Sequence, residues 1–195
     1  MIGLTGGIAC GKTFVSDTMK KYKVDVIDAD LITRRLYQPG SPLLQQIIDA
    51  FGAEFLLPDG NLDRAALKSY IFAEEARKER LNEIVQPAIR KAIFRDLMDA
   101  PGEHQLLVVP LLIEAGYTEL CDEIWVVQVD EATQLQRLLK RDGISEALAR
   151  SMIQSQMPFE EKKAYADRII DNRGRRRDTE KQLRKTFLQY LKKNC

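Results

Sequence analysis

The sequence lacks any long apolar segment. No stretch approaches the roughly 20 apolar residues that cross a membrane, and the chain does not start with the basic segment and apolar run of a secretory signal. Cysteine is also scarce: the 195 residues contain three, Cys10, Cys121 and Cys195, and no two of them have metal-ligand spacing. We therefore expect a soluble cytoplasmic protein whose cysteines are free thiols in a reducing compartment.

The chain has no excess of charge of either sign. Lys and Arg number 30 against 29 Asp and Glu, and this net charge of +1 gives no reason to expect a nucleic-acid or membrane partner. Histidine and tryptophan occur once each. We expect His104, in a polar segment, to be exposed, and Trp125, in an apolar run, to lie in the core.

Short apolar runs alternate with helical patterns along the chain. Continuous apolar runs of this kind are typical of strands in a parallel sheet that is covered by helices on both faces. Five segments qualify: Met1–Thr5, Val24–Asp28, Gln105–Pro110, Glu123–Val129 and Arg168–Ile170. We predict an α/β fold with three layers, built around a five-stranded parallel sheet.

A long helical stretch separates the second predicted strand from the third. It exceeds the length of one crossover helix, so we predict a helical insertion that binds substrate. Within it, Ser41 and Pro42 should cap and open one helix, Asp63 should cap a second, and Pro87 should open a third.

A second helical stretch separates the fourth strand from the fifth. It is broken near Gly143, after which Ser145 should cap one helix and Pro158 should open another. A helical excursion over the carboxyl edge of a sheet is typical of a lid. The chain ends with an amphipathic pattern whose apolar positions are 183, 187, 188 and 191, which predicts a packing helix.

The segment Gly6–Thr13, which we call the phosphate loop, carries the clearest chemical signal. Its sequence GGIACGKT matches G-x-x-x-x-G-K-[ST], and it lies between a predicted strand and a helical pattern that runs to Tyr22. Backbone N–H groups in such a loop form an anion-binding nest, to which the helix start adds positive potential. We expect Lys12 to reach the β- and γ-phosphates of a nucleotide and the Thr13 hydroxyl to bind Mg²⁺.

Asp28 and Asp30 follow the second strand, at the edge where open parallel sheets bind ligands. On an extended segment their carboxylates would point to the same side, where one could accept a proton from a hydroxyl and the other bind Mg²⁺. The alternative is a pair that only caps the next helix; after a phosphate loop we favour the catalytic interpretation. Arg34, one helical turn after Asp30, is either an anion clamp or a surface arginine.

The third predicted strand lacks the aspartate that often binds Mg²⁺ in nucleotide-binding proteins. Pro110 stands in its place, so metal binding would depend on the acidic pair after the second strand, with Glu114 as a second polar contact. Arg141 begins the predicted lid and suits the stabilisation of a transferring phosphoryl group.

A GTP-binding switch is disfavoured by a missing motif. The guanine-reading pattern N-K-x-D does not occur, and the two D-x-x-G segments, 99–102 and 171–174, do not follow a strand next to the loop strand. The loop and the acidic pair alone would serve a nucleoside monophosphate or shikimate kinase equally well. The helical insertion, which is expected to bind the acceptor substrate, would distinguish between these kinases.

Six segments together resemble the dephospho-coenzyme A kinase family almost from end to end. They are GLTGGIACGKT, VIDADLITRRLYQPGSP, LNEIVQPAIR, VVPLLIEAGY, QLQRLLKRDG and ADRIIDNRG. The resemblance implies a P-loop kinase fold, a helical domain that binds dephospho-CoA, and a lid. It also implies the ATP- and Mg²⁺-dependent phosphorylation of the ribose 3′-hydroxyl of dephospho-CoA, the last step of coenzyme A biosynthesis.

The resemblance assigns roles to individual residues. Asp30 is similar to the catalytic base and Arg141 to the lid arginine, and with Lys12 they are the predicted catalytic residues. The predicted ATP contacts are Gly7, Ile8, Ala9, Cys10, Gly11, Lys12, Thr13, Phe14, Val15, Asn172 and Gly174. The predicted dephospho-CoA contacts are Thr5, Asp30, Arg34, Pro110, Leu111, Leu112 and Glu114. Thr13 is the predicted Mg²⁺ ligand, with Asp28 as a second candidate.

The same resemblance predicts how the chain is divided. A nucleotide-binding core would comprise residues 1–30, 104–140 and 167–195, a dephospho-CoA subdomain 31–103, and a lid 141–166, all within a single P-loop kinase domain. The expected partner is the small molecule dephospho-CoA, and the expected assembly is a monomer or a weak homo-oligomer.

The phosphate loop departs from the family pattern, which has Gly-Ser where this chain has Ala9 and Cys10. Ala9 must keep a negative φ or accept strain, although its N–H remains available. Cys10, beside Lys12 and a helix start, is in surroundings that lower a thiol pKa, which raises the hypothesis of an oxidation switch. The favoured alternative is a small residue that fills the serine position. Gln86 replaces a usual histidine, so any ionisable role there is lost.

Overall fold

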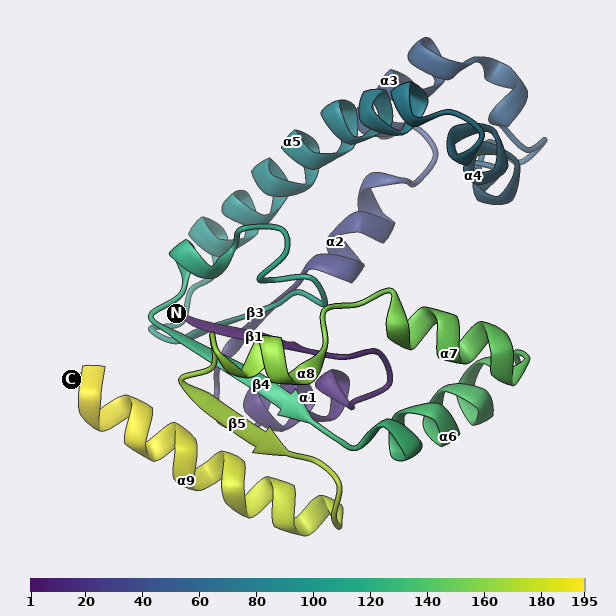
Figure 1. The fold of residues 1–195 in the computed structure, drawn as a ribbon. Helices are drawn as coiled ribbons and strands as arrows, with labels where there is room; N and C mark the ends of the chain where they lie inside the picture. The colour runs from purple at the N-terminus through teal and green to yellow at the C-terminus, as the bar shows by residue number, and fades with distance from the viewer. Residues whose placement is uncertain (195) are drawn as a thin grey trace. The chain divides into compact units, whose positions relative to one another are not determined.

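The computed structural model describes residues 1–194 and divides into two compact units (Figure 1). The first unit joins Met1–Ile27 to the chain from Ala100 onward, and the second is Asp28–Asp99. The second unit has nearly the bounds of the expected helical insertion, whereas the segment expected to form a lid belongs to the first unit by its contacts. Cys195, one of the three predicted free thiols, lies outside the described residues.

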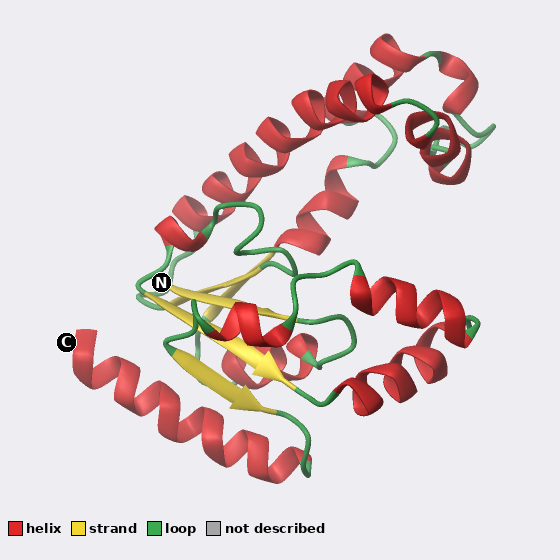
Figure 2. Ribbon diagram, viewed as in Figure 1, coloured by secondary structure: helices red, strands yellow, loops and turns green. Residues whose placement is uncertain are grey.

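A five-stranded sheet forms the centre of the first unit (Figure 2). Its strands are β1 (Ile2–Gly6), β2 (Asp25–Asp28), β3 (Gln105–Val108), β4 (Glu123–Gln128) and β5 (Arg168–Asp171). They lie in the order β2-β3-β1-β4-β5, and β1 pairs in parallel with both β3 and β4, as β4 does with β5. The predicted α/β fold and its five strands are confirmed.

The position of β1 in this order fixes the ligand edge of the sheet. Its neighbours are β3 on one side and β4 on the other, with Leu4 in register with Val108 and Trp125. Ligands of open α/β sheets bind outside the carboxyl ends of the strands where the order reverses in this way. The loop that follows β1 therefore starts at the expected binding edge.

Helices flank the sheet in the first unit. They are α1 (Lys12–Lys20), α6 (Glu131–Asp142), α7 (Glu146–Gln154), α8 (Phe159–Lys163) and α9 (Arg176–Asn194), with a 3₁₀ turn at Thr118–Leu120. Figure 1 shows α1 behind the sheet and α8 in front of it. The contacts agree, since α1 packs on β1, β3 and α9, whereas α8 packs on β4. Between residues 1 and 194, no helix combines the length and apolar character needed to cross a membrane.

The C-terminal helix α9 packs on the core through one face. Leu183, Phe187 and Tyr190 are 0%, 6% and 3% exposed and share a cluster with Trp125, whose predicted core position is confirmed. The apolar role predicted for Leu188 is wrong, because this side chain is 49% exposed. Positions 183, 187 and 190 lie on one helical face, whereas 188 is turned about 100° from 187.

His104 is half-buried rather than exposed, contrary to the prediction. Its ring meets those of Phe187 and Tyr190 edge-on, with centroids 5.8 and 6.1 Å apart. Its carbonyl also accepts a hydrogen bond from the Asp25 N–H at 3.0 Å. Packing of α9 therefore partly covers His104, which was predicted to be exposed because its sequence neighbours are polar.

The second unit is helical. It contains α2 (Ala29–Leu36), α3 (Pro42–Phe51), α4 (Arg64–Phe72) and α5 (Glu75–Asp99), with a 3₁₀ turn at Ala53–Phe55. The predicted caps are confirmed: Ser41 Oγ accepts from the Leu44 N–H at 3.1 Å, and Asp63 Oδ1 from the Ala66 N–H at 2.9 Å. The helices enclose a core of their own, made of Leu43, Leu44, Ile47, Phe55, Leu62, Leu67, Ile71 and Val85.

Pro87 lies inside α5 and does not open it, so this prediction is wrong. The helix begins at Glu75, and the residues before the proline are mostly strong helix formers. A proline within a helix costs about 3 kcal/mol, because it removes an N–H donor and crowds the preceding turn. Val85 is 7% exposed in the core of the unit, and packing of this kind offsets that cost.

Candidate active site

The phosphate loop joins β1 directly to α1, as its sequence context predicts. Three of its residues have a positive φ: Gly6 at 147°, Ala9 at 57° and Gly11 at 95°. Gly11 is the N-cap of α1, so the loop closes over the unpaired N–H groups of the helix start. This arrangement forms a cradle for an anion, with backbone donors and the positive end of the helix on the same side.

Ala9 accepts strain. Its φ of 57° lies in the left-handed region, which costs a residue with a Cβ roughly 1–2 kcal/mol. The loop therefore keeps a conformation that its own sequence disfavours at this residue. Contacts from other elements must hold it there.

Replacing Ala9 with glycine should raise the melting temperature. Glycine relieves the left-handed strain, and its greater freedom in the unfolded chain offsets part of the gain, so we expect a net stabilisation of about 0.5–1 kcal/mol. For a chain of this length that corresponds to about 1–4 °C. Thermal unfolding followed by circular dichroism would measure it, with Ala132→Gly in α6 as a control that should lower the melting temperature. A lower melting temperature for Ala9→Gly would contradict the strain argument.

Lys12 opens α1 and places its ammonium against the loop backbone. Its Nζ lies 2.7 Å from the Gly6 carbonyl and 3.1 Å from the Gly7 carbonyl. These bonds hold the cation at the carboxyl end of β1. A phosphate in the cradle offers charged acceptors, which form stronger hydrogen bonds with an ammonium than neutral carbonyls do.

Two glutamines hold both backbone polar groups of Ile8. The Ile8 N–H donates to Gln156 Oε1 at 2.7 Å, and Gln134 Nε2 donates to the Ile8 carbonyl at 2.8 Å. Gln134 lies on α6 and Gln156 follows α7, so segments far along the chain fix the tip of the loop. Both glutamines also line a cavity of about 60 Å³ together with Cys10 and Lys162.

Asn172 and Arg137 hold the other side of the loop. Asn172 Nδ2 donates to the Cys10 carbonyl at 2.8 Å, and Arg137 donates to that carbonyl at 3.4 Å and to the Asn172 carbonyl at 2.9 Å. Asn172 is 5% exposed, and its Oδ1 accepts from Thr179. A Cβ on Gly11 would come within 2.2 Å of Asn172 Nδ2, so this close approach requires glycine. Asn172, predicted to contact ATP, is thus placed against the loop backbone.

Sequence reasoning missed Gln134, Arg137 and Gln156 as loop contacts. A signal existed for two of them: Gln134 and Arg137 are three residues apart on a helix that follows the carboxyl end of β4, and so share a face. Gln156 lies in the turn between α7 and α8, where no spacing marks it.

The surroundings of Cys10 contradict a lowered thiol pKa. The side chain is 1% exposed in the main core, and burial raises its pKa against smaller lowering effects of Lys12 and Arg137. Cys121 is similar, since burial raises its pKa to about 11. The structure thus favours the alternative in which Cys10 is a small residue filling the serine position.

Cys10 should therefore resist alkylation and oxidation in the folded protein. At pH 7.5 a buried thiol with a raised pKa exposes almost no thiolate, the reactive form. We expect iodoacetamide to leave Cys10 unmodified in mass spectra of the native protein and to modify it in urea. Peroxide should leave the activity of the wild type and of Cys10→Ser equally unchanged. Labelling as fast in the native state as in urea would restore the switch hypothesis.

Asp28 and Asp30 do not share an extended segment, so that prediction is wrong. Asp28 ends β2, and its Oδ1 accepts from the Asp30 N–H at 2.9 Å and from the Leu31 N–H at 3.3 Å. The chain turns helical at Ala29, so Asp28 is the N-cap of α2. For Asp28, this is the capping role that was considered as the alternative to catalysis. Asp30 lies exposed in the first turn of α2, and Arg34 follows one turn later on the same helix.

The other predicted acceptor contacts lie before the phosphate loop or after β3. Thr5 is fully buried, and its hydroxyl donates to the Pro110 carbonyl at 3.0 Å. Leu112 is 0% exposed, so its side chain belongs to the core, and a contact with the acceptor at this residue would have to use its backbone. Leu111 is 46% exposed, and the side chain of Glu114 is 25% exposed.

The remaining predicted ATP contacts differ in exposure. Thr13 is exposed in the first turn of α1, and Gly174 is exposed in the turn between β5 and α9. Phe14 is half-buried, with the Arg176 guanidinium 5.3 Å from its ring centroid. Val15 is 0% exposed, so its side chain packs in the core.

Arg141 lies in the last turn of α6 and pairs with its neighbour. Its Nε and a terminal nitrogen lie 2.6 and 2.9 Å from the two carboxylate oxygens of Asp142, and its side chain is 56% exposed. The hydrogen bonds raise the pKa of Arg141 and lower that of Asp142. The arginine that touches the phosphate loop is Arg137, one turn earlier.

A match to a known family covers most of the chain. The model of the dephospho-CoA kinase family aligns with residues 1–178. The chain belongs to this family. Among curated dephospho-CoA kinases, that of Shouchella clausii is 44% identical over 185 residues, covering 93% of this chain and 94% of its own. That of Geobacter metallireducens is 43% identical over 197 residues, covering 100% and 98%.

Solved structures agree with membership of the dephospho-CoA kinase family. Dephospho-CoA kinase from Campylobacter jejuni superposes with a TM-score of 0.73 at 26% identity, covering 100% of this chain and 98% of its own. The Thermus thermophilus protein TT1252 gives a TM-score of 0.84 at 26% identity, covering 96% of each chain. Shikimate kinase from Acinetobacter baumannii, at 14% identity and a TM-score of 0.57, shares the fold alone. The predicted P-loop kinase fold is confirmed.

Proposed function

We propose that this family member transfers the γ-phosphoryl group of ATP to the ribose 3′-hydroxyl of dephospho-CoA, which yields coenzyme A in the last step of its biosynthesis. One observation carries the proposal: a phosphate loop with Lys12 at the start of α1, in a chain that matches dephospho-CoA kinases over nearly its whole length. The loop supplies the nucleotide site, and family membership supplies the acceptor.

The phosphate loop would hold the ATP phosphates through its backbone N–H groups. Lys12 would exchange its carbonyl partners for β- and γ-phosphate oxygens. Gln134, Gln156, Arg137 and Asn172 support this role, because they bond the backbone of Ile8 and Cys10 and so fix the shape of the loop. Such preorganised donors stabilise developing charge without rearranging during the reaction.

Thr13 would hold Mg²⁺, and its exposed hydroxyl in the first turn of α1 suits this hard cation. The residues from 1 to 194 contain no group of three or more His, Cys, Asp and Glu side chains that could hold a metal. Protein sites for Mg²⁺ commonly supply one or two oxygens and leave the rest to phosphates and water, so Thr13 fits such a site. When bound, the ion would neutralise charge on the phosphates. Asp28 remains a second candidate, although its Oδ1 caps α2.

Asp30 would orient the 3′-hydroxyl and accept its proton. Its position in the first turn of α2 leaves the carboxylate exposed at the end of β2, and Arg34 follows on the same helix as an anion contact. The proton moves from the hydroxyl to the carboxylate as the oxygen attacks the γ-phosphorus and ADP leaves. Arg141 would stabilise the transferring group from the segment 141–166, which we propose acts as a lid.

An acceptor assay tests this function directly. The protein should consume ATP with dephospho-CoA, and not with shikimate or nucleoside monophosphates, because its insertion belongs to the dephospho-CoA kinase family. Phosphorus NMR of the product should locate the new phosphate on the 3′-oxygen. Turnover with shikimate or a nucleoside monophosphate, and none with dephospho-CoA, would replace the proposal with another small-molecule kinase.

We further propose that the protein acts in the cytoplasm as a monomer or weak homo-oligomer, with no nucleic-acid or membrane partner. The near-balanced charge and the small-molecule substrates of the family support this view. Light scattering of the purified protein over a range of concentrations would measure the assembly.

A further inference from the structure

Lys162 is a buried lysine at the ligand edge of the sheet. It lies on α8, and its side chain is 1% exposed. Its Nζ donates to Glu114 Oε1 at 2.6 Å. An ammonium removed from water is costly unless it is paired, so the fold retains this cation together with Glu114.

The pair connects α8 to the segment that follows β3. Within that segment, the Pro110 carbonyl accepts from Thr5, which lies just before the phosphate loop. Lys162 itself lines the small cavity that Gly7 and Cys10 of the phosphate loop also line. Residues 110–114 are thus tied at one end to the loop strand and at the other end to Lys162.

A second buried charge cluster provides a comparison. Glu123 is 1% exposed and accepts from Trp125 Nε1 at 3.1 Å, Lys193 at 3.2 Å and Arg168 at 3.5 Å. It is the first residue of β4, at the end of the strand away from the phosphate loop, and its carboxylate is enclosed. The Glu114 side chain, by contrast, keeps 25% of its surface exposed at the ligand edge. The carboxylate of Glu123 is therefore buried, whereas that of Glu114 remains accessible.

We infer that Lys162 is a positioning residue for the acceptor. It fixes Glu114 through Oε1, and the same carboxylate accepts a hydrogen bond from an O–H or N–H donor of the acceptor through Oε2. Lys162 does not touch the acceptor. It keeps the Glu114 carboxylate in one orientation, which a carboxylate on a turn would not hold alone. The inference rests on the proposed function, since it concerns the acceptor of that reaction.

Lys162→Met tests this role, with Arg168→Met as its matched control. Each variant removes one cationic partner of a carboxylate, Glu114 or Glu123, and keeps an unbranched apolar stem; Glu123 retains Lys193 as a second cation. We expect Lys162→Met to raise the KM for dephospho-CoA about tenfold or more and to leave ATP affinity within about twofold. Arg168→Met should lower the melting temperature with both KM values within about twofold of the wild type.

Coupling between the partners gives a second readout. Glu114→Gln should raise the acceptor KM about as much as Lys162→Met, and the double variant should be no worse than either, because the two side chains act as a unit. If Lys162→Met does not fold, Glu114→Gln alone carries the test, since its side chain is partly exposed.

Two results would overturn the inference. One is an unchanged acceptor KM in Lys162→Met or Glu114→Gln, which would make the pair merely structural like that of Arg168. The other is an equal rise of both KM values, which would mean general distortion of the site. A wild-type protein that fails to phosphorylate dephospho-CoA would instead overturn the proposed function, so the two failures can be told apart.

Discussion

Asp30→Asn is expected to lower kcat by about 10³-fold while ATP affinity changes by less than about twofold. Asparagine keeps the size and hydrogen-bonding reach of the side chain and cannot accept the proton of the 3′-hydroxyl. ATP binding should persist, because the phosphate loop belongs to other elements of the chain. Steady-state kinetics with dephospho-CoA and a fluorescence titration with ATP would measure the two effects separately.

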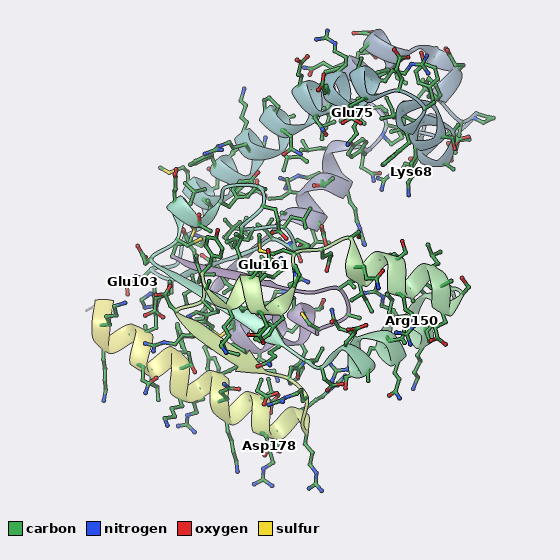
Figure 3. The ribbon with its side chains drawn as sticks, in the orientation of Figure 1. Lys68, Glu75, Glu103, Arg150, Glu161 and Asp178 are labelled. Atoms are coloured by element: carbon green, nitrogen blue, oxygen red, sulfur yellow. The ribbon has the colours of Figure 1, made fainter. Side chains whose placement is uncertain are left out.

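Asp178→Asn is the matched control for this variant. Asp178 is also an exposed acidic residue in the first turn of a helix, at the start of α9 (Figure 3). Both variants lose a favourable interaction with a helix dipole, worth about 0.3–1 kcal/mol, so their melting temperatures should fall alike. Only Asp30→Asn should lose activity. If it kept activity within about threefold of the wild type, Asp30 would not be the base.

Lys12→Met should have the second large effect, a loss of about 10²–10³-fold in kcat. The variant removes the ammonium that we propose stabilises the phosphoryl group, and methionine fills a similar volume. Because Lys12 also bonds the Gly6 and Gly7 carbonyls, the change should loosen the loop and weaken ATP binding. Titration with ATP and single-turnover kinetics would separate weaker binding from a slower chemical step.

Lys20→Met is the control for Lys12→Met, because it removes a lysine from the same helix at a position away from the phosphate loop. Lys20 lies on the same helix, exposed and paired with Asp17 at 3.0 Å, so its loss should change neither kcat nor ATP affinity measurably. If Lys12→Met matched this control in kcat, the phosphoryl group would be stabilised by other residues.

Local sequence signals were sufficient to predict the sheet and most helix ends. The central strands β1 and β4 are buried along nearly their whole length, and burial on both faces of a parallel sheet requires mostly apolar runs of this kind. Ser41, Asp63 and Ser145 were found because each cap bonds a backbone N–H within three residues, so its signal is local.

Features that depend on distant contacts could not be predicted this way. Pro87 stays within α5 because the core of the second unit stabilises the helix around it, which no local pattern shows. In the same way, Asn172 meets the loop from 162 residues farther along the chain. The Asp28–Asp30 geometry failed for another reason: an extended pair requires the helix to begin after Asp30, but it begins at Ala29.

The order of the strands also sets a problem for synthesis of the chain. β1 is made first, yet Ile2 pairs with Leu106 and Glu123, which follow more than a hundred residues later. At about 5–20 residues per second, a ribosome needs on the order of 5–20 s to supply these partners. Asp28–Asp99, which is continuous in sequence, emerges whole in the meantime. The helical unit can therefore fold while translation continues, whereas the nascent β1 strand must be kept from aggregating until β3 leaves the ribosome.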